Sequence, residues 1–388
     1  MLRNAAAIVG MGTTEFSRDS GRSELRLAGE AILGALEDAG LQPEEVDGLV
    51  TFTLDNNDEA EVFRTIGGCE LKFFSRINYG GGGACAPVLQ AAMAVACGLA
   101  RTVVVYRAMN ERSEYRFGTG EIKQNAVVSA KAALYGLHNV QGLRTAAACI
   151  AMLMRRYMHE YGATEEDFGR IAISARDFAA TNPNAWFYQK PITMDAYLQS
   201  RMIADPFRLL DCCQQSDGAV ALVITSSDRA RDLKRKPVLI RAAAQGSCDD
   251  QMEMTSYYRK DITAFSESRS VARQLYTMAD LEPNDISLAI LYDHFGPTVL
   301  PQLEAFGFCG RGEAAQLVKD GVIGRNGRLP VNTHGGQVGE AYVHGMNGIA
   351  EAVRQVRGCA VNQVDDVRNV LVAAAISVPT SGIILGAP

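Results

Sequence analysis

The chain has 388 residues, 47% of them hydrophobic, and its 38 basic and 44 acidic side chains give a formal net charge of −6. This is the composition of a globular protein with two or three domains or one duplicated unit, and its acidity argues against a nucleic-acid-binding protein. No hydrophobic run approaches the ~20 residues that a membrane helix needs, and the N-terminus lacks the apolar segment of a secretory signal.

The first part of the chain alternates between short apolar segments and segments with apolar residues at helical spacing. A helix is predicted over 25–39, because a glycine follows it as a helix C-cap would, and a second helix over 86–98. The strands expected around them are 5–12, 48–52 and 102–106. Strands that alternate with helices of this length indicate an α/β fold.

A polar, helical region at about 110–210 interrupts this alternation. It contains the amphipathic segment 146–161 and the turn Asn182-Pro183-Asn184-Ala185. An apolar strand at 217–224 then returns to the core. We expect the region 110–210 to be an insertion that covers one face of the core.

Two sequence echoes indicate an internal repeat. Residues 39–43 and 279–283 each precede an apolar strand, at a constant offset of 240 residues. The glycine-containing segments 78–82 and 332–336 each precede a helix of small residues and then another apolar strand. Chance similarity between two βα units is the alternative to a duplication. The predicted halves are residues 1–250, which include the insertion, and residues 251–388.

The nine cysteines are an odd number without a CxxC spacing. The adjacent Cys212 and Cys213 cannot easily form a disulfide with each other. We therefore expect free thiols and a cytoplasmic protein.

The glycine run 80–83 lies at a predicted strand-to-helix turn. It has neither the GxGxxG spacing of a dinucleotide site nor the Gly-Lys-Ser/Thr of a P-loop, so nucleotide binding is not expected. One interpretation is that its backbone N–H groups face a substrate oxygen, because glycine lets the backbone approach a ligand closely. The other is that these glycines only pack a tight buried turn.

Two stretches of the second half carry titratable side chains where α/β folds gather their active sites. Tyr292 and His294 directly follow an apolar strand, and Tyr342 and His344 lie in a glycine-rich loop before a helix. The local pattern leaves open a structural role for each of the four, as a half-buried or hydrogen-bonded core residue. No metal site is expected, because His334 and His344 lack HExxH or comparable spacing.

These stretches, the glycine turn and the repeat make the chain resemble the thiolase superfamily over essentially its whole length. Ile203-Ala204-Asp205-Pro206, Asp211-Cys212-Cys213 and Asp217-Gly218-Ala219 are similar to the branch related to sterol-carrier-protein thiolases. The resemblance implies a thiolase fold, with duplicated βαβαβαββ halves in a five-layered αβαβα arrangement and a helical loop domain inserted.

The chain departs from working thiolases at each of their catalytic motifs. Counted from Asn78, the position of the family's nucleophilic cysteine is Gly81, and the catalytic positions of the two later motifs are Tyr292 and Tyr342. The family's late Cys-x-Gly motif has no match in residues 373–378. Without that cysteine there is no acyl-enzyme and no thiolysis by the usual route.

Two tyrosines at the positions that hold the thioester oxygen in thiolases resemble the thiolase-like aldolases of bacterial steroid side-chain degradation. That resemblance implies a lyase that cleaves a steroid β-hydroxyacyl-CoA, of the 17-hydroxy C22 type, to a 17-keto steroid and propionyl-CoA. The alternatives are a non-catalytic thiolase-fold scaffold, and an acyltransferase or thiolase that uses Cys85 as a displaced nucleophile.

Retro-aldol cleavage needs a base for the β-hydroxyl, donors for the thioester enolate and an acid for the α-carbon. Our hypothesis divides the base and the acid or oxyanion roles between Tyr292 and Tyr342. His294 or His344 would be a cationic or hydrogen-bonding partner that favours a phenolate. Lower-ranked supporting residues are Asp293 and Asn332, and the expected oxyanion or substrate-binding glycines are Gly81, Gly82, Gly335 and Gly336.

The resemblance also implies assembly with other chains. Thiolase-fold proteins are at least dimeric, and steroid aldolases of this kind work with an OB-fold partner of the DUF35 type, which would give a heterotetramer. The coenzyme A thioester is expected to be a substrate seated on the insertion at 110–210. No resident cofactor is expected, and any zinc would belong to the partner.

Overall fold

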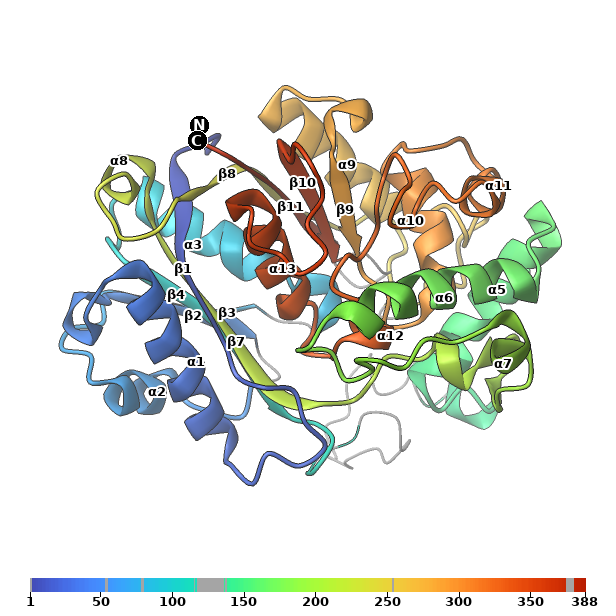
Figure 1. Ribbon diagram of the computed structural model, residues 1–388, viewed down its shortest axis with the longest axis horizontal. Helices are drawn as coiled ribbons and strands as arrows, with labels where there is room; N and C mark the ends of the chain where they lie inside the picture. The colour runs from blue at the N-terminus through green and yellow to red at the C-terminus, as the bar shows by residue number, and fades with distance from the viewer. Residues whose placement is uncertain are drawn as a thin grey trace.

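The computed structural model describes residues 2–52, 55–77, 80–114, 116, 136, 138–252, 255–374 and 380–388. Asn78, from which the nucleophile position is counted, and most of the expected Cys-x-Gly position lie outside them. The central feature is a nine-stranded mixed sheet in the order β3-β2-β4-β7-β1-β8-β11-β10-β9 (Figure 1). Its strands are β1 (Ala6–Thr13), β2 (Gly48–Phe52), β3 (Phe73–Ile77), β4 (Val103–Asn110), β7 (Asp217–Ser226), β8 (Val238–Gly246), β9 (Leu288–Leu291), β10 (Asn369–Ala374) and β11 (Thr380–Gly386).

The sheet consists of two halves with the same strand order, which confirms the predicted duplication. In the first half β1 pairs antiparallel with β7, β7 antiparallel with β4, and β4 parallel with β2. In the second half β8, β11, β10 and β9 repeat these three pairings in the same order. A short pairing of β1 with β8 joins the halves. By strand pairing, the second repeat begins with β8, which lies before the predicted boundary at residue 250. The limits of the two domains therefore stay a prediction.

Helices cover both outer faces of the sheet and fill a layer between its halves. The principal helices are α1 (Glu24–Ala39), α2 (Glu59–Ile66), α3 (Ala86–Ala96), α5 (Ala146–Tyr161), α6 (Glu165–Thr181), α7 (Met194–Leu198), α8 (Ser227–Ala230), α9 (Ser266–Ala279), α10 (Val299–Ala305), α11 (Ala314–Lys319), α12 (Gly336–Gly339) and α13 (Met346–Arg357). Within the described ranges, no helix is long and apolar enough to span a bilayer.

Three hydrophobic clusters correspond to the layers of the fold. One holds α1 and α2 on the outer face of the first half, and one holds α9 and α10 on the outer face of the second. The third packs α3 and α13 between the strands of both halves. Figure 1 shows this order, with the blue and cyan half on the left and the orange and red half on the right. The predicted αβαβα layering is therefore confirmed.

The local signals in the sequence explain the helix limits. Ser23 accepts a hydrogen bond from the backbone N–H of Arg26 at the start of α1, and Gly40 ends the helix with a φ of 73°. The predicted helix 146–161 is α5. The predicted strand 102–106 is longer than expected, because β4 continues through Arg107 to Asn110 with every residue buried.

The inserted region lies against the second half of the molecule. Its helices α5 and α6 contribute to the same hydrophobic cluster as α9 and α10, and Figure 1 shows them in green beside the orange segments. A two-stranded hairpin, β5 (Met202–Ala204) and β6 (Phe207–Arg208), follows α7. The described part of this region therefore packs on the second half, and its helix α6 packs against α12 beside the candidate site; the limits of the insertion stay a prediction.

Candidate active site

The hydroxyl groups of Tyr292 and Tyr342 lie 3.1 Å apart, at hydrogen-bond distance. Tyr292 is the first residue after β9, and Tyr342 lies in the loop between α12 and α13. Their exposed fractions are 5% and 8%. Burial raises the pKa of both side chains well above the usual value for tyrosine. At neutral pH both are therefore protonated hydrogen-bond donors, and neither is a phenolate.

Two side-chain amides hold the end of β9 from opposite sides. Asn332 accepts a hydrogen bond from the N–H of Leu291 at 2.8 Å and donates to its C=O at 2.9 Å. Gln302, on α10, does the same for the backbone of Tyr292, at 3.0 Å and 2.7 Å. Asn332, predicted as a supporting residue, thus uses its amide to fix the strand that carries Tyr292.

A buried carboxylate anchors the loop that carries Tyr342. Glu340 is fully buried and accepts hydrogen bonds of 3.0 Å from Asn182, in the insertion, and from Asn347, in α13. Burial raises the pKa of its carboxyl to about 7. The backbone N–H of Tyr342 donates to the hydroxyl of Ser216 at 3.4 Å. The loop is therefore held at the Glu340 side chain and at the backbone of Tyr342.

The segment 212–216 connects the two tyrosine-bearing loops. The N–H of Cys213 donates to the C=O of His294 at 2.8 Å, and the N–H of Gln214 donates to the C=O of Gln337 at 2.9 Å. A β-bridge pairs Gln215 with Tyr342. Because this segment runs directly into β7, the first half of the fold positions both loops of the second half.

Gly81 faces the hydroxyl of Tyr292. A Cβ atom placed on Gly81 would lie 1.4 Å from the Tyr292 oxygen, far inside any contact distance. Gly81 and the buried Gly82 belong to a short 3-10 turn, residues 81–83, that leads into α3. The Tyr292 hydroxyl thus occupies the space that a side chain at position 81 would need, and a cysteine there would exclude this tyrosine.

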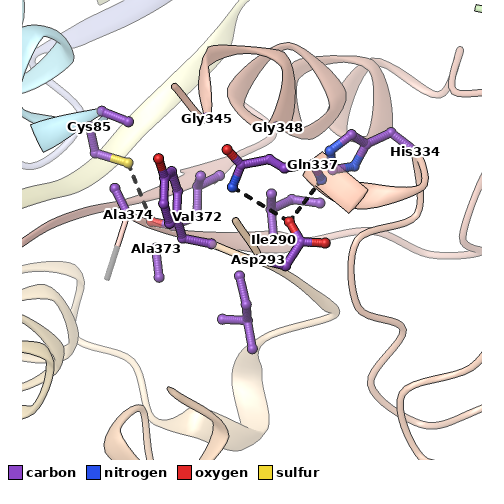
Figure 2. Close-up of a pocket in the computed structure, with 13 residues that line it drawn as sticks. Cys85, Ile290, Asp293, His334, Gln337, Gly345, Gly348, Val372, Ala373 and Ala374 are labelled. Atoms are coloured by element: carbon purple, nitrogen blue, oxygen red, sulfur yellow. Dashed lines mark hydrogen bonds between the residues drawn. The ribbon is translucent and has the colours of Figure 1, made fainter. Parts of the chain in front are cut away.

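Cys85 does not have the surroundings of a nucleophile. Its side chain is fully buried at the start of α3, and its thiol contacts the C=O of Val372 at 3.6 Å. Burial raises the pKa of this thiol far above its ordinary value. Figure 2 shows Cys85 among the residues that line a small pocket, whose volume of ≈ 10 Å³ is about the room of one water molecule. This cavity is too small for an acyl-CoA substrate.

Burial argues against a cationic role for the two histidines beside the tyrosines. The rings of His294 and Tyr292 lie 5.0 Å apart, and those of His344 and Tyr342 lie 5.2 Å apart edge to face. Burial lowers the pKa of His294 to about 3 and that of His344 well below its usual value. Both imidazoles are therefore neutral at physiological pH, and neither supplies a positive charge that would favour a phenolate.

Asp293 and the glycine pair after His334 form a tight internal contact. Asp293 is buried and accepts a hydrogen bond from the N–H of Gln337 at 2.8 Å, as Figure 2 shows. A Cβ on Gly336 would lie 1.9 Å from Asp293, and one on Gly335 would lie 2.6 Å from Ala179 of α6. Both glycines have positive φ. Packing thus explains why both residues are glycine. An oxyanion role for them stays a prediction.

Sequence reasoning missed three charged residues around the tyrosines. Arg107 in β4 forms a buried ion pair of 3.1 Å with Asp55, and it also donates to His344. Glu111, next to the end of β4, is 3% exposed and accepts a hydrogen bond from Gln215 at 3.1 Å. Its charge contributes to the raised pKa of both tyrosines. The available signal in the sequence was that Arg107 lies within the largely apolar strand β4 and that Glu111 directly follows it.

Comparison with known proteins places the chain among named relatives. A family model described as thiolase C-terminal domain-like matches residues 249–383. The steroid side-chain-cleaving aldolase of Thermomonospora curvata is 60% identical over 387 residues, which are 100% of this chain and 99% of that protein. The 17-hydroxy-3-oxo-4-pregnene-20-carboxyl-CoA lyase of Mycobacterium tuberculosis is 57% identical over 386 residues, 100% of both chains.

Among solved structures, an Ltp2-ChsH2(DUF35) aldolase matches with a TM-score of 0.95 and 60% sequence identity, over 100% of this chain and 98% of that one. The predicted thiolase fold and the predicted kinship with steroid aldolases are thus confirmed. The chain belongs to the thiolase superfamily, in the branch that contains the steroid side-chain-cleaving aldolases.

Proposed function

We propose that this chain is a carbon–carbon lyase that cleaves the side chain of a steroid β-hydroxyacyl-CoA by a retro-aldol reaction. The substrate is of the 17-hydroxy C22-CoA type, and the products are a 17-keto steroid and propionyl-CoA. Two relatives at 60% and 57% identity, named as an aldolase and as a lyase of such a thioester, support the assignment. The observation that carries it is the pair of tyrosine hydroxyls, 3.1 Å apart, beside Gly81, which stands at the position predicted for the thiolase nucleophile.

In this proposal the two tyrosines act as donors to the oxygen of the thioester. As the bond between the α-carbon and the β-carbon breaks, the electron pair moves onto the thioester to form an enolate. Two protonated hydroxyls stabilise that developing charge. The raised pKa of Tyr292 and of Tyr342 supports this role over the role of a base in the resting enzyme. One of the two then protonates the α-carbon, which yields propionyl-CoA, and the proton released by the β-hydroxyl restores that tyrosine.

The proton of the β-hydroxyl must pass to another group, and two buried carboxylates are the candidates for accepting it. The charge of Glu111 acts on both tyrosines, and Asp293 follows Tyr292 in the chain and acts on it as well. A carboxylate is a far better base at neutral pH than a protonated phenol. Comparing Glu111→Gln with Asp293→Asn separates the candidates, because only the loss of the true acceptor lowers kcat by about 10²–10⁴-fold.

We further propose that the enzyme is a cytoplasmic homodimer that binds a DUF35-type partner to form a heterotetramer. The solved aldolase that it matches is named as a complex with such a partner. The edge strand β3 supports the dimer, because Phe74 is 63% exposed on an outermost strand of the sheet. All nine cysteines are free, as expected of a reducing compartment. Coenzyme A enters as part of the substrate, and no resident cofactor takes part.

The test is mass spectrometry of the products formed from a 17-hydroxy steroid C22-CoA thioester by the protein co-expressed with a DUF35 partner. Propionyl-CoA and a 17-keto steroid, formed without free coenzyme A, would support retro-aldol cleavage. Products that appear only with free coenzyme A would support a thiolase instead. A folded complex that releases no product would leave two options, a different β-hydroxyacyl-CoA as the substrate or a non-catalytic scaffold.

A further inference from the structure

Arg107 is a buried charge on the third strand from one edge of the sheet. It lies on β4, where each of the eight residues is buried, and its side chain is 2% exposed. The carboxylate of Asp55, whose side chain is 0% exposed, lies 3.1 Å from its guanidinium. Arg76 of β3 holds the segment that carries Asp55, because it donates to the C=O of Asp55 at 2.9 Å. Such a pair is retained at a considerable desolvation penalty, which calls for a reason beyond stability.

The guanidinium also contacts the imidazole of His344. The Nε of Arg107 lies 3.2 Å from the Nδ1 of His344. A guanidinium has only donors, so the Nδ1 atom must accept, and the hydrogen of the neutral ring is on Nε2. His344 has a φ of 48°, in the left-handed region that side chains other than glycine rarely adopt. Strain of this kind persists where the surroundings fix a residue for function.

We infer that Arg107 is a positioning residue that holds His344 as a neutral imidazole with its hydrogen on Nε2, edge-on to Tyr342. The inference rests on the proposed function and deepens it, because it adds a neutral imidazole, edge-on to Tyr342, to the two tyrosines. Among the described residues, charged and titratable groups that face the His344 ring include Arg107 from β4 and His294 from the segment after β9, together with Tyr342. A nearby cation disfavours a second proton on the imidazole, so His344 stays a donor and does not act as a base.

The first experiment reads the tautomer directly, without any substrate. The chain has five histidines, so histidine-selective ¹⁵N labelling of the full-length protein in its complex gives few signals. The His344→Gln variant assigns the signal of His344. We expect one protonated and one unprotonated nitrogen, with Nε2 protonated, and no titration across the pH range in which free histidine titrates. A protonated Nδ1, or an imidazolium in the neutral range, would overturn the inference.

The second experiment changes the positioning residue and keeps its charge. Arg107→Lys retains an ion pair with Asp55 but loses the planar fork that reaches the imidazole. We expect His344 to populate both tautomers, kcat to fall by roughly 10²-fold at an unchanged KM, and the pH–rate profile to gain a limb on its acidic side. An unchanged tautomer together with an unchanged kcat would refute the assignment.

Arg357→Lys is the matched control. Arg357 has a side chain 8% exposed and forms an ion pair of 2.6 Å with Asp38, at the far end of α13 from the site. This variant should alter neither the His344 signal nor kcat. If Arg107→Lys does not fold, the tautomer in the unmodified protein still decides the question. If the unmodified protein releases no propionyl-CoA, the proposed function fails while the nitrogen signals still test the role of Arg107.

Discussion

The segments before α3 and before α13 occupy equivalent places in the two halves, but they carry different groups. Before α3 the chain has the glycine turn 81–83, with no side chain at the position facing Tyr292. Before α13 the loop carries Glu340, Tyr342 and His344, each buried and in contact with other polar groups. Duplication of the fold has therefore not duplicated the chemistry. The second half supplies the hydroxyl groups, and the first half supplies space and support.

The strongest test of this contrast removes a hydroxyl from the second half. Tyr292→Phe and Tyr342→Phe keep the ring and its packing, so the fold should be intact by circular dichroism and thermal unfolding. Each should lower kcat for propionyl-CoA release by about 10²–10⁴-fold, because a donor to the enolate is lost. Full turnover by both single variants would show that the chemistry lies elsewhere.

A second test fills the space that the first half provides. In Gly81→Ala the new methyl group would overlap the Tyr292 oxygen, so the tyrosine must move away from Tyr342. We expect kcat to fall by roughly 10²-fold, since small displacements of a reacting group have effects of that size. The crystal structure of the variant should show a longer distance between the two hydroxyl oxygens.

Gly34→Ala is the control for Gly81→Ala. Gly34 lies within α1, and an added Cβ would make an ordinary contact of 3.8 Å. This change should leave kcat unaltered and stabilise the helix by roughly 0.5–1 kcal/mol, as alanine does relative to glycine. If Gly81→Ala behaved in the same way, the space facing Tyr292 would have no functional meaning.

A third test concerns the buried carboxyl group of Asp293, the residue after Tyr292. Burial raises the pKa of Asp293 from 3.8 to about 6, so the folded protein binds this proton more tightly than the unfolded chain. The contribution of Asp293 to the free energy of unfolding is therefore greatest at low pH, and it is lost progressively as the pH rises to about 6.

Asp293→Asn should consequently gain stability relative to the unmodified protein over the same rise in pH. Urea unfolding at a series of pH values measures this difference. Asp232→Asn, which removes an exposed carboxylate, is the matched control. If Asp293→Asn instead lost stability relative to the unmodified protein as the pH rises, the expected sign would be wrong.

The smallest effect on catalysis is expected at the outer edge of the first half. Phe74→Lys places a charge on the exposed edge strand β3, which should weaken a dimer formed through that edge. Light scattering after gel filtration should show a lower mass, while kcat per chain changes only a few-fold. Val361→Lys, at another exposed apolar residue, should leave the mass unchanged. An unchanged mass for Phe74→Lys would place the interface elsewhere.

The sequence was sufficient to predict the alternation of strands and helices, because the helix signals are local, and the resemblance to thiolases added the layered architecture. The glycine after α1, the spacing within α5 and the two glycine segments each correspond to an element of the structure. The positions of Tyr292 and Tyr342 came from motif counting, and the structure brings their hydroxyls together. Their roles in catalysis stay a prediction.

What sequence could not supply depends on contacts between distant segments. The charge state of His294 and His344 follows from complete burial, which no local pattern reveals. The pair of Arg107 and Asp55 spans 52 residues of sequence. The role of the segment 212–216 appears only once β7 is placed beside the loops of the second half.

The overlap between a side chain at position 81 and the Tyr292 hydroxyl also constrains how such an enzyme can arise. An ancestor with a cysteine at position 81 has no room for this tyrosine, so the loss of the cysteine must come before the gain of the tyrosine or together with it. The intermediate with glycine and the older residue at position 292 would catalyse neither reaction by these routes. Gene duplication, which relieves one copy of selection, would allow a lineage to pass through that inactive stage.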